Sequence, residues 1–514
     1  MGKEIRVRKS IQELQDAYTK GDKKPLENLM RAWKGIKDLP ATDPNSFFML
    51  GGYHGEPFRG GGWGSSAYWG GYCNHGNVLF PTWHRVYLYQ LEKALQSIKG
   101  CADVTLPFWD ETSDESLKNG IPWALTQETF TLDGVVIPNP LRSFVFNKNI
   151  TDNISGDNPN YSKPLGYETV RYPLSGLVGN EAERTATKTH NAQFLNYADN
   201  VKILNANIVA WLGSLIVVDG KSIKTNVYQK FVDCLNAPNY TIFSNTTSAA
   251  QWNEDAGTAI VPIESPHNDI HLAVGGFDIP GADFSPIPGA NGDMGENDTA
   301  GLDPIFFFHH CFIDRVFWLW QKKHQSTDAL CIIAEYPGTN TIDNQGPTPG
   351  MVPNSWLTLE TPLNPFKTAG GKVFTSLDCI NIEKQLGYTY GPGSLDDKAA
   401  VAAARTIEST KAVRVSGLNR AGIRGSFLIS AFATIDGKRV HVGTESVLSR
   451  WNVKGCANCQ THLETKAAIS LHGLADSSFA SARYDVEVRT HDGVLGAGLA
   501  QDASGKKLLR VEVR

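Results

Sequence analysis

The stretch DPIFFFHHCFIDRVFWLW, Asp303 to Trp320, places two adjacent histidines, His309 and His310, in an almost wholly apolar and aromatic run. At helical spacing His310 and Asp314 share one face. Burying an imidazole without a hydrogen bond or a metal costs free energy, so both rings need partners. A core helix with hydrogen-bonded histidines explains this run as well as a metal site does. The metal interpretation therefore depends on histidines elsewhere in the chain.

The chain has 514 residues, of which 41% are hydrophobic and 10% aromatic, which predicts at least two well-packed domains. Its net charge of -5 gives no reason to expect nucleic acid or an anionic membrane as a partner, so a small molecule is the default. The charged N-terminus lacks the apolar core of a signal peptide and no long apolar span follows, so we expect a cytoplasmic protein. Eight cysteines are too few for a disulfide scaffold.

The hydrophobic pattern changes along the chain. Residues 5–38 carry the periodicity of two helices, whereas residues 45–76 are rich in glycine and aromatics and predict irregular backbone. Residues 101–251 have short hydrophobic patches between Asn, Pro, Gly and Asp, which predicts long loops over short helices. From about Lys411 the sequence alternates, as in the short strands of a β-sandwich.

These changes predict a domain at residues 1–393, a linker at 394–410 and a β-rich domain at 411–514. Residues 396–514 hold 17 Lys and Arg against 12 Asp and Glu, a net charge of +5. Residues 1–395 hold 31 against 41, a net charge of -10. The opposite charges favour docking of one domain on the other.

Six of the 13 histidines form the candidate metal set. They are His54, His75, His84, His267, His271 and His310. His267 and His271 lie four residues apart, hence on one face of a helix, and Glu264 stands one turn earlier. Neutral imidazole binds copper, zinc, nickel or iron, and two sets of three would leave each metal an open position. Each fragment alone is weak evidence, but together they indicate a two-metal site.

The motifs around these histidines resemble the type-3 dicopper proteins, and within them the tyrosinases. The matching pieces are GYHGEPF, YCNHG, FPTWHR, ESPHNDIH and DPIFFFHHCFIDR, followed by YTYG at residues 388–391. The resemblance covers roughly residues 45–390 and implies a mainly α catalytic domain with a four-helix bundle dicopper core and long loops. It assigns two copper ions, CuA to His54, His75 and His84 and CuB to His267, His271 and His310, with O2 as co-substrate.

The resemblance implies ortho-hydroxylation of monophenols such as tyrosine, oxidation of o-diphenols to o-quinones, and a place in melanin biosynthesis. Glu264 and Asn268 match a pair that in similar enzymes holds a water near CuB, where it can take the phenol proton. A helix-start carboxylate and a surface amide are the plainer interpretations. The pair favours a tyrosinase over a catechol oxidase. The expected partners are small phenols, and a homo-oligomer stays open.

Two other protein classes are alternatives. A hemocyanin-like oxygen carrier would share all six histidines and differ in substrate access. A di-zinc hydrolase usually includes Asp or Glu among its ligands, which the histidine set does not.

The same resemblance implies roles for residues that neighbour the six histidines. Cys73, two residues before His75, matches a Cys-x-His pattern that is cross-linked as a thioether in some tyrosinases, with a reduced buried thiol as the alternative. His309 points about 100° away from His310 on a helix, so it would form a hydrogen bond beside the metals. Phe306 would cover the copper pair and belong to the substrate pocket, or simply pack in the core.

Asp314 and Arg315 would orient imidazoles and close the bundle, although a plain buried ion pair explains them equally well.

The resemblance also implies that the C-terminal domain covers the active site as a lid. Cys456 and Cys459 form a lone C-x-x-C, for which we favour copper loading over zinc, a redox motif or a surface disulfide. Val447 and Trp451 are the candidates for a side chain that plugs the substrate site, although Trp451 would equally suit the core. We also expect latency that acid or proteolysis near residues 391–410 relieves.

Overall fold

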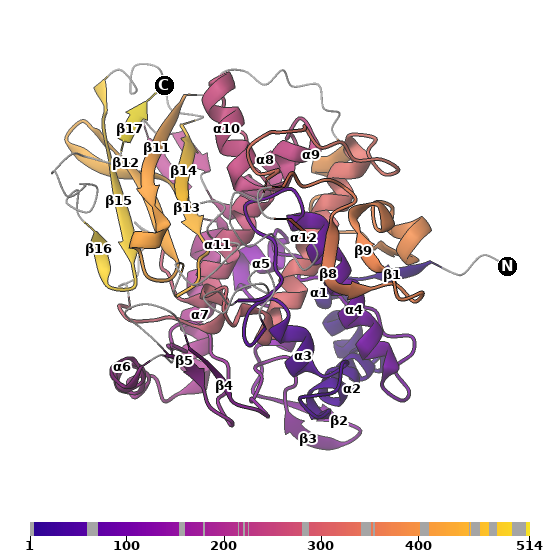
Figure 1. Ribbon diagram of the computed structural model, residues 1–514. Coiled ribbons are helices and arrows are strands. Elements are labelled where there is room, and N and C mark those ends of the chain that lie inside the picture. Colours follow the sequence, from indigo (N-terminus) through magenta and orange to yellow (C-terminus); the bar gives the residue numbers. More distant parts are fainter. Residues whose placement is uncertain are drawn as a thin grey trace.

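The computed structural model covers the chain from end to end. It describes residues 5–58, 70–153, 160–177, 180–213, 215–218, 221–224, 226–279, 287–340, 351–352, 355–400, 411–451, 453, 463–471, 481–495 and 510–513. A helical N-terminal domain and a sheet-rich C-terminal domain lie side by side (Figure 1).

Helices build the N-terminal domain. They are α1 (Ile11–Thr19), α2 (Lys24–Asp38), α3 (Phe47–Gly52), α4 (Phe80–Ser97), α5 (Asp114–Asn119), α6 (Glu181–Asn191), α7 (Tyr197–Gly213), α8 (Val227–Cys234), α9 (Tyr240–Ser244), α10 (Thr246–Ala256), α11 (Glu264–Gly275), α12 (Ile305–Lys323) and α13 (Asp396–Ala400). The two helices predicted within residues 5–38 are α1 and α2. Ser10 begins α1 as an N-cap that accepts a hydrogen bond from the backbone N–H of Glu13.

Four helices, α2, α4, α11 and α12, form the core of this domain. Every residue of α12 from Ile305 to Gln321 is buried. Trp33 of α2 packs on Phe307 and Phe308 of α12, with ring centroids 5.9 and 5.7 Å apart. Helix α12 also contacts α4 and α11. The predicted mainly α domain with a four-helix core is therefore confirmed, and the aromatic run lies at its centre.

The loop predictions were incomplete in two places. The glycine-rich stretch contains the short helix α3, capped by Ser46. The stretch at residues 101–251 contains the 17-residue helix α7. Its polar and apolar residues mix, but Ile208 and Trp211 are buried and α7 packs on α11. Tertiary contact, not an amphipathic pattern, stabilises this helix.

Short strands border the helical domain. They are β1 (Arg6–Arg8), β2 (Thr129–Leu132), β3 (Val135–Pro138), β4 (Ile150–Asn153), β5 (Asn160–Lys163), β6 (Leu215–Val218), β7 (Lys221–Lys224), β8 (Pro362–Lys367), β9 (Val373–Thr375) and β10 (Tyr388–Tyr390). Four sequential pairs form antiparallel hairpins, whereas β1 and β10 pair in parallel and join the two ends of the domain.

Two antiparallel sheets form the C-terminal domain. Its strands are β11 (Ala412–Asn419), β12 (Phe427–Ile435), β13 (Lys438–Val447), β14 (Glu464–Ser470), β15 (Arg483–Thr490), β16 (Gly493–Leu495) and β17 (Arg510–Val513). One sheet has the order β14-β11-β17 and the other β13-β12-β15-β16. Val413, Phe427 and Ile429 belong to a separate apolar core between them. The predicted sandwich-like domain is confirmed.

The first part of the predicted linker belongs to the helical domain. Leu395 is fully buried in the core of that domain. The Ser394 hydroxyl donates to Asp110 at 2.5 Å, and Asp396 of α13 forms an ion pair with Arg315 at 2.5 Å. Residues 401–410 lie outside the described residues.

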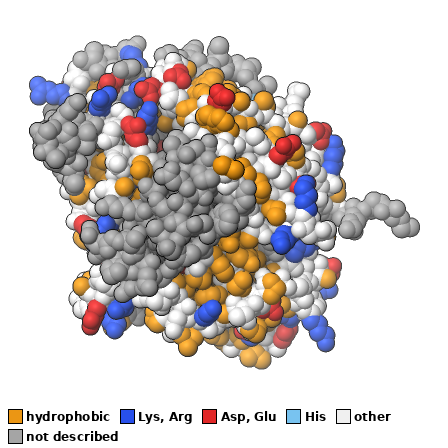
Figure 2. Space-filling model, in the orientation of Figure 1, with side chains coloured by type: hydrophobic (Ala, Val, Ile, Leu, Met, Phe, Trp, Pro, Cys, Tyr) orange, Lys and Arg blue, Asp and Glu red, His pale blue; other side chains and the backbone are white. Residues whose placement is uncertain are grey.

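Basic and acidic side chains are interspersed on the face that Figure 2 shows. Among the described residues, no helix is both long enough and apolar enough to cross a membrane.

Candidate metal centre

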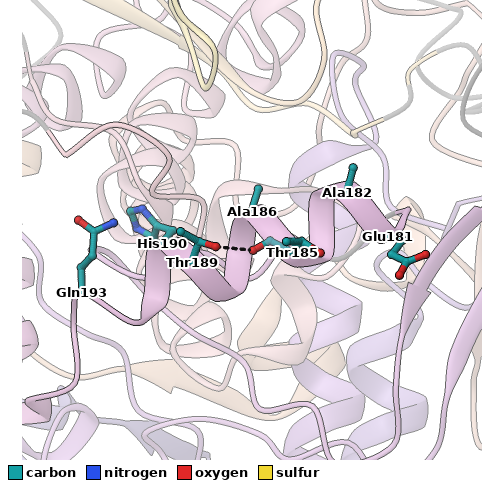
Figure 3. Close-up of a pocket in the computed structure, with 7 residues that line it drawn as sticks. All are labelled: Glu181, Ala182, Thr185, Ala186, Thr189, His190 and Gln193. Carbon is teal, nitrogen blue, oxygen red and sulfur yellow. Dashed lines mark hydrogen bonds between the residues drawn. The ribbon is translucent and has the colours of Figure 1, made fainter.

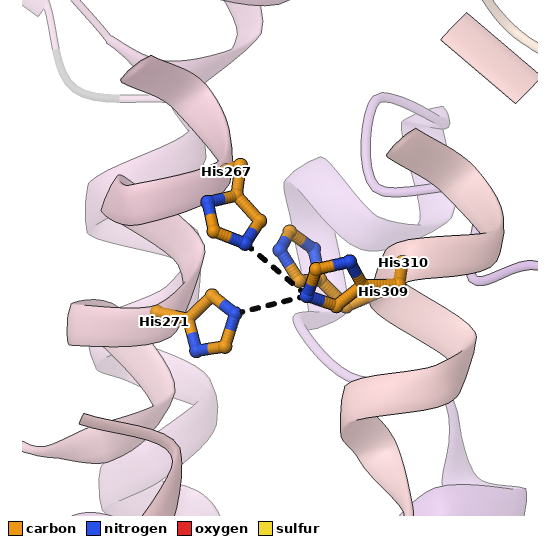
Figure 4. Close-up of side chains that lie close together, drawn as sticks. All are labelled: His267, His271, His309 and His310. Atoms are coloured by element: carbon orange, nitrogen blue, oxygen red, sulfur yellow. Dashed lines mark hydrogen bonds between the residues drawn. The ribbon is translucent and has the colours of Figure 1, made fainter. Parts of the chain in front are cut away.

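Helices α11 and α12 bring three imidazoles to one point. His267 and His271 lie on the same face of α11, and His310 approaches from α12 (Figure 4). The Nε2 atom of His310 lies 3.1 Å from Nε2 of His267 and 3.2 Å from Nε2 of His271. Nδ1 of His267 bonds to Asn268 Oδ1 at 2.9 Å, and Nδ1 of His271 to Met294 O at 2.8 Å. Those bonds turn the Nε2 lone pairs toward the shared point.

Three further imidazoles face this group from less regular segments. His54 follows α3, His75 lies in the loop before α4, and His84 lies in the first turns of α4. Their ring centroids are 5.1 to 5.6 Å apart. Nδ1 of His84 donates to Phe80 O at 2.8 Å. The Nε2 atoms of all three are buried without a hydrogen-bond partner in the described structure.

The two groups of histidines face each other across a short gap. The His84 ring stacks on His310 with centroids 4.5 Å apart, and His75 lies 5.6 Å from His267. Burial lowers the pKa of all six imidazoles, that of His84 to about 3 and that of His271 to about 4. Each ring is therefore neutral at pH 7, the form that binds metals.

The donor set fits two copper ions. Unpaired, neutral imidazole nitrogens in a buried site are costly without a metal and are suitable ligands for copper. The clusters that could hold a metal contain histidines and Cys73 but no carboxylate among the described residues. That composition argues against a di-zinc hydrolase.

His309 and His310 have different surroundings. Nδ1 of His309 is hydrogen-bonded to Oε1 of Glu111 at 2.6 Å, and both side chains are fully buried. Burial, with some help from Asp110, raises the pKa of Glu111 well above its usual range. His309 also lies within reach of His267 and His271. The convergence of Nε2 atoms on His310 supports His310 as the ligand and His309 as its hydrogen-bonded neighbour.

Phe306 lies at the level of the histidines. Its ring stacks on His310 at 4.0 Å between centroids and meets His54 edge-on at 4.7 Å. It is fully buried and does not line the cavity described below. The structure therefore gives Phe306 the task of shielding the imidazoles, and its predicted place in a substrate pocket stays a prediction.

Asp314 and Arg315 connect α12 to other parts of the domain. Asp314 accepts hydrogen bonds at 2.6 Å from Arg85 Nε and from the hydroxyls of Tyr388 and Tyr390. Arg315 donates to Gly391 O and pairs with Asp396. Among the described residues none of these partners is an imidazole. Both residues instead join α12 to α4 and to the segment at residues 388–396, and their predicted effect on the imidazoles stays a prediction.

The side chains around His75 include the predicted cross-link partner. Nδ2 of Asn297 lies 3.3 Å from His75 Nδ1 and 4.0 Å from Cys73 Sγ. The Cys73 sulfur also lies within 4.8 Å of a ring nitrogen of His54 and of a ring nitrogen of His75. This proximity is compatible with a thioether, which stays a prediction.

Glu264 and Asn268 share a cavity of about 250 Å³ between the two domains with His75. Glu264 accepts from Gly76 N at 2.7 Å, and its other oxygen accepts from the backbone N–H and hydroxyl of Thr246. Burial raises the pKa of Glu264, and those hydrogen bonds oppose the rise. Nδ2 of Asn268 donates to Ser446 O of the C-terminal domain at 3.3 Å.

The C-terminal domain covers this site with residues 445–451. Val447 and Leu448 line the cavity, and Val447 stays a candidate for the plug. Trp451 lies elsewhere: its N–H groups donate to Asp298 Oδ2 and Glu183 Oε1, at 2.9 and 3.3 Å. Trp451 is therefore an interdomain contact rather than the plug. Cys456 and Cys459 lie outside the described residues.

Arg450 inserts into the helical domain beside His54. Its guanidinium pairs with Asp298 at 3.0 Å and donates to His54 O at 3.3 Å and Cys73 Sγ at 3.4 Å. Both partners of the ion pair are buried. Two more ion pairs, Arg424–Glu183 and Lys466–Glu254, join the two domains. In both, the C-terminal domain supplies the cation and the helical domain the carboxylate, as the opposite net charges predict.

A second hollow runs along α6, and its lining residues in the described part of the chain lie between Glu181 and Gln193 (Figure 3). His190 lies on its wall, and its Nε2 bonds to Pro173 O. Among the described residues, this hollow contains no group of metal ligands.

Sequence reasoning missed Glu111, Met294 and Asn297. Glu111 and Asn297 lie 198 and 222 residues along the chain from the histidines that they contact, and Met294 lies 23 residues from His271, so no spacing motif marks them. The preference of buried polar groups for partners predicted that His309 needs one, without saying which.

Comparisons with known proteins agree with this geometry. Residues 44–323 match the family model described as the common central domain of tyrosinase. A tyrosinase of Hahella sp., HcTyr2, is 53% identical, over 95% of this chain and 92% of the relative. A tyrosinase of Aspergillus oryzae is 46% identical, over 94% and 92%. The solved tyrosinase of Burkholderia thailandensis at low pH superposes with a TM-score of 0.86 at 53% identity, covering 99% of this chain and all of that one.

The fold and the six imidazoles define a type-3 dicopper protein, an oxidoreductase that uses two copper ions. The chain belongs to the tyrosinase family.

Proposed function

We propose that this enzyme hydroxylates monophenols at the ortho position and oxidises the resulting o-diphenols to o-quinones with O2, and that its C-terminal domain holds it latent. Two copper ions held by the six histidines would supply the binding and reduction of O2. The identities of 53% and 46% to tyrosinases over nearly the whole chain support this reaction. Six neutral imidazoles that converge as two facing sets of three are the observation that carries it.

The surrounding residues shield part of the site and hold a neighbour of the ligands. Phe306 covers His310 and His54, and Glu111 holds His309. A dry, aromatic site prevents side reactions of the copper pair with solvent.

Glu264 and Asn268 would handle the phenol proton. Glu264 is held by Gly76 and Thr246, so its orientation is fixed next to the loop that carries His75. A water held between Glu264 and Asn268 would take the proton of a monophenol as a general base. In the docked state Asn268 Nδ2 instead donates to Ser446 O, so the lid occupies a donor that this water would need. Lid release would free Asn268 and open the cavity beside Val447.

Substitution of Asn268 by Leu tests the role of this pair. We expect hydroxylation of monophenols to fall about 10- to 100-fold more than oxidation of catechols, since only the first step needs the phenol proton removed by the held water. Rates with tyrosine and with a catechol, measured after lid removal, give the ratio. Equal loss of both activities would contradict the role of Asn268 and favour a catechol oxidase.

A further inference from the structure

The segment at residues 293–298, between α11 and α12, reaches both sets of histidines. Nδ1 of His271 donates to Met294 O at 2.8 Å, and Nδ2 of Asn297 lies 3.3 Å from Nδ1 of His75. Met294 contributes a backbone carbonyl, which any residue would offer, whereas Asn297 contributes its side chain. Asn297 is 5% exposed, so its amide needs partners inside the protein.

Three of the six imidazoles share one arrangement that His75 lacks. In His84, His267 and His271, Nδ1 bonds to an oxygen at 2.8, 2.9 and 2.8 Å. A ring that donates from Nδ1 keeps its lone pair at Nε2, where it can bind a metal. Nε2 of His75 is buried and free of hydrogen bonds within the described structure, but its Nδ1 faces the amide nitrogen of Asn297.

The side-chain amide of Asn297 presents its donor to this ring. Nδ2 donates but cannot accept, so it cannot pair with an N–H at Nδ1 of His75. Oδ1, the atom that could accept, is buried without a partner in the part of the chain that the structure describes. A half-turn about the Cβ–Cγ bond exchanges the two atoms at little steric cost. It brings Oδ1 to Nδ1 and gives His75 the arrangement of the other three rings.

The docked lid holds the backbone that carries this amide. The N–H of Asn297 donates to Ser449 O at 3.0 Å, and the neighbouring Asp298 forms the buried ion pair with Arg450. Two consecutive residues of the lid thus bind two consecutive residues of the helical domain. Release of the lid removes both contacts, and Asn297 then loses the support for its position beside His75.

We propose that Asn297 is a positioning residue for the CuA ligand His75: its amide oxygen accepts the Nδ1–H of the ring, and the docked lid holds it there. The hydrogen bond fixes the ring and makes Nε2 a stronger ligand. Copper in the CuA set is therefore held more tightly while the lid is docked. This inference rests on the dicopper site and goes beyond the proposed reaction. Its test follows copper without turnover, so its failure leaves the proposed oxidation of phenols untouched.

The rate of copper release from the full-length, copper-loaded enzyme to EDTA tests this proposal. The same measurement on His310→Ala, which lacks a CuB ligand, shows which phase of release belongs to the CuA copper. Asn297→Leu keeps the size and removes the acceptor, so it should release that copper about 10- to 100-fold faster than wild type and leave the CuB phase unchanged. Asn297→Asp keeps an acceptor and removes the donor, so it should retain the CuA copper at least as well as wild type.

Asn291→Leu is the matched control. Asn291 is a buried asparagine close to the same segment, and its Nδ2 donates to Glu296 at 2.5 Å. Its loss should leave the release of both coppers near the wild-type rate, even where it lowers the melting temperature. Asn297→Ala replaces Asn297→Leu if the leucine variant fails to fold.

Ser426→Ala tests the support from the lid. The Ser426 hydroxyl donates to Gly295 O at 2.6 Å and accepts from Ser449 N at 2.8 Å, so it ties the lid to the segment of Asn297. This variant should speed release of the CuA copper, but less than Asn297→Leu does. Wild-type release in Asn297→Leu, release in Asn297→Asp as fast as in Asn297→Leu, or equal acceleration of both coppers would overturn the role of Asn297. An unchanged rate in Ser426→Ala would overturn the part of the lid.

Discussion

The two sets of histidines differ in the backbone that carries them. The CuB wall, formed by His267, His271 and His310, is helical, whereas the CuA wall, formed by His54, His75 and His84, consists largely of loops. His267, His271 and His310 stand on α11 and α12, and their Nε2 atoms already converge. His54 and His75 stand on irregular backbone, where Arg450 of the lid and Asn297 contact them. Packing of α11 against α12 thus positions the CuB histidines, whereas contacts from distant segments position His54 and His75. The lid therefore does more than cover the site, because its Arg450 also contacts the backbone that carries the CuA ligand His54.

The largest expected effect is on the helical wall. His310→Ala should leave about one copper per chain and reduce catechol oxidation to background, because the CuB set loses a ligand that the other two rings face. His309→Ala is the matched comparison and should weaken copper binding only about 10- to 100-fold, as expected for a neighbour of the ligands. Copper content and rate are measured together. Equal loss in both variants, or greater loss in His309→Ala, would reverse the assignment.

The next effect concerns the buried ion pair between lid and CuA wall. Arg450→Gln should weaken lid docking by about 3–5 kcal/mol, because Asp298 is left buried and unpaired. Lys466→Gln breaks the more exposed pair with Glu254 across the same interface and should cost less than about 1 kcal/mol. The measurement is the activity of each full-length variant divided by its own activity after lid removal, which cancels direct effects on copper. Equal ratios in the two variants would contradict the importance of Arg450.

A smaller effect is expected from the sulfur in the CuA loop. Copper-loaded enzyme should weigh two hydrogens less than its sequence predicts, and Cys73→Ala should abolish this deficit. Freeing the His75 ring should weaken the CuA copper about 10- to 100-fold and leave the CuB copper in place. Intact-mass and metal analysis check both points. A full-mass wild type after copper loading would exclude the thioether.

The smallest effect is a dependence of lid docking on pH. His491 of the lid packs on Phe277 at 4.6 Å, and its Nδ1 donates to Ala290 O at 3.2 Å. Burial lowers the pKa of His491 to about 4, while the hydrogen bond and Asp492 oppose this. The docked state therefore favours the neutral ring. Docking is strongest above about pH 6.5 and weakens as the pH falls toward 4, by about 1–2 kcal/mol for a partly exposed group.

His491→Asn keeps a donor for Ala290 O and removes the titration. Its latency should vary less with pH than that of wild type between pH 6.5 and 4. His324→Asn is a control in the helical domain, where His324 Nε2 bonds to Leu235 O. Identical pH profiles of wild type and His491→Asn would show that other groups release the lid.

The sequence predicted the helical wall better than the loop wall. The four-residue spacing of His267 and His271 and the aromatic run around His310 fix one face of each helix, so local pattern sufficed. Glu111 lies 198 residues from His309, and Arg450 lies 396 residues from His54. Such contacts depend on the tertiary fold, which no local periodicity encodes. The prediction of Trp451 as a plug rested on the size of its side chain. Size does not determine which way a side chain points, and Trp451 contacts Asp298 and Glu183 instead of the cavity.

Metal analysis of the purified full-length enzyme shows whether the six histidines hold two copper ions. Six neutral imidazoles in two facing sets predict two coppers per chain after copper loading, in the lidded and the lid-free enzyme alike. One copper per chain, or zinc retained in preference to copper, would contradict a dicopper site built from these two walls.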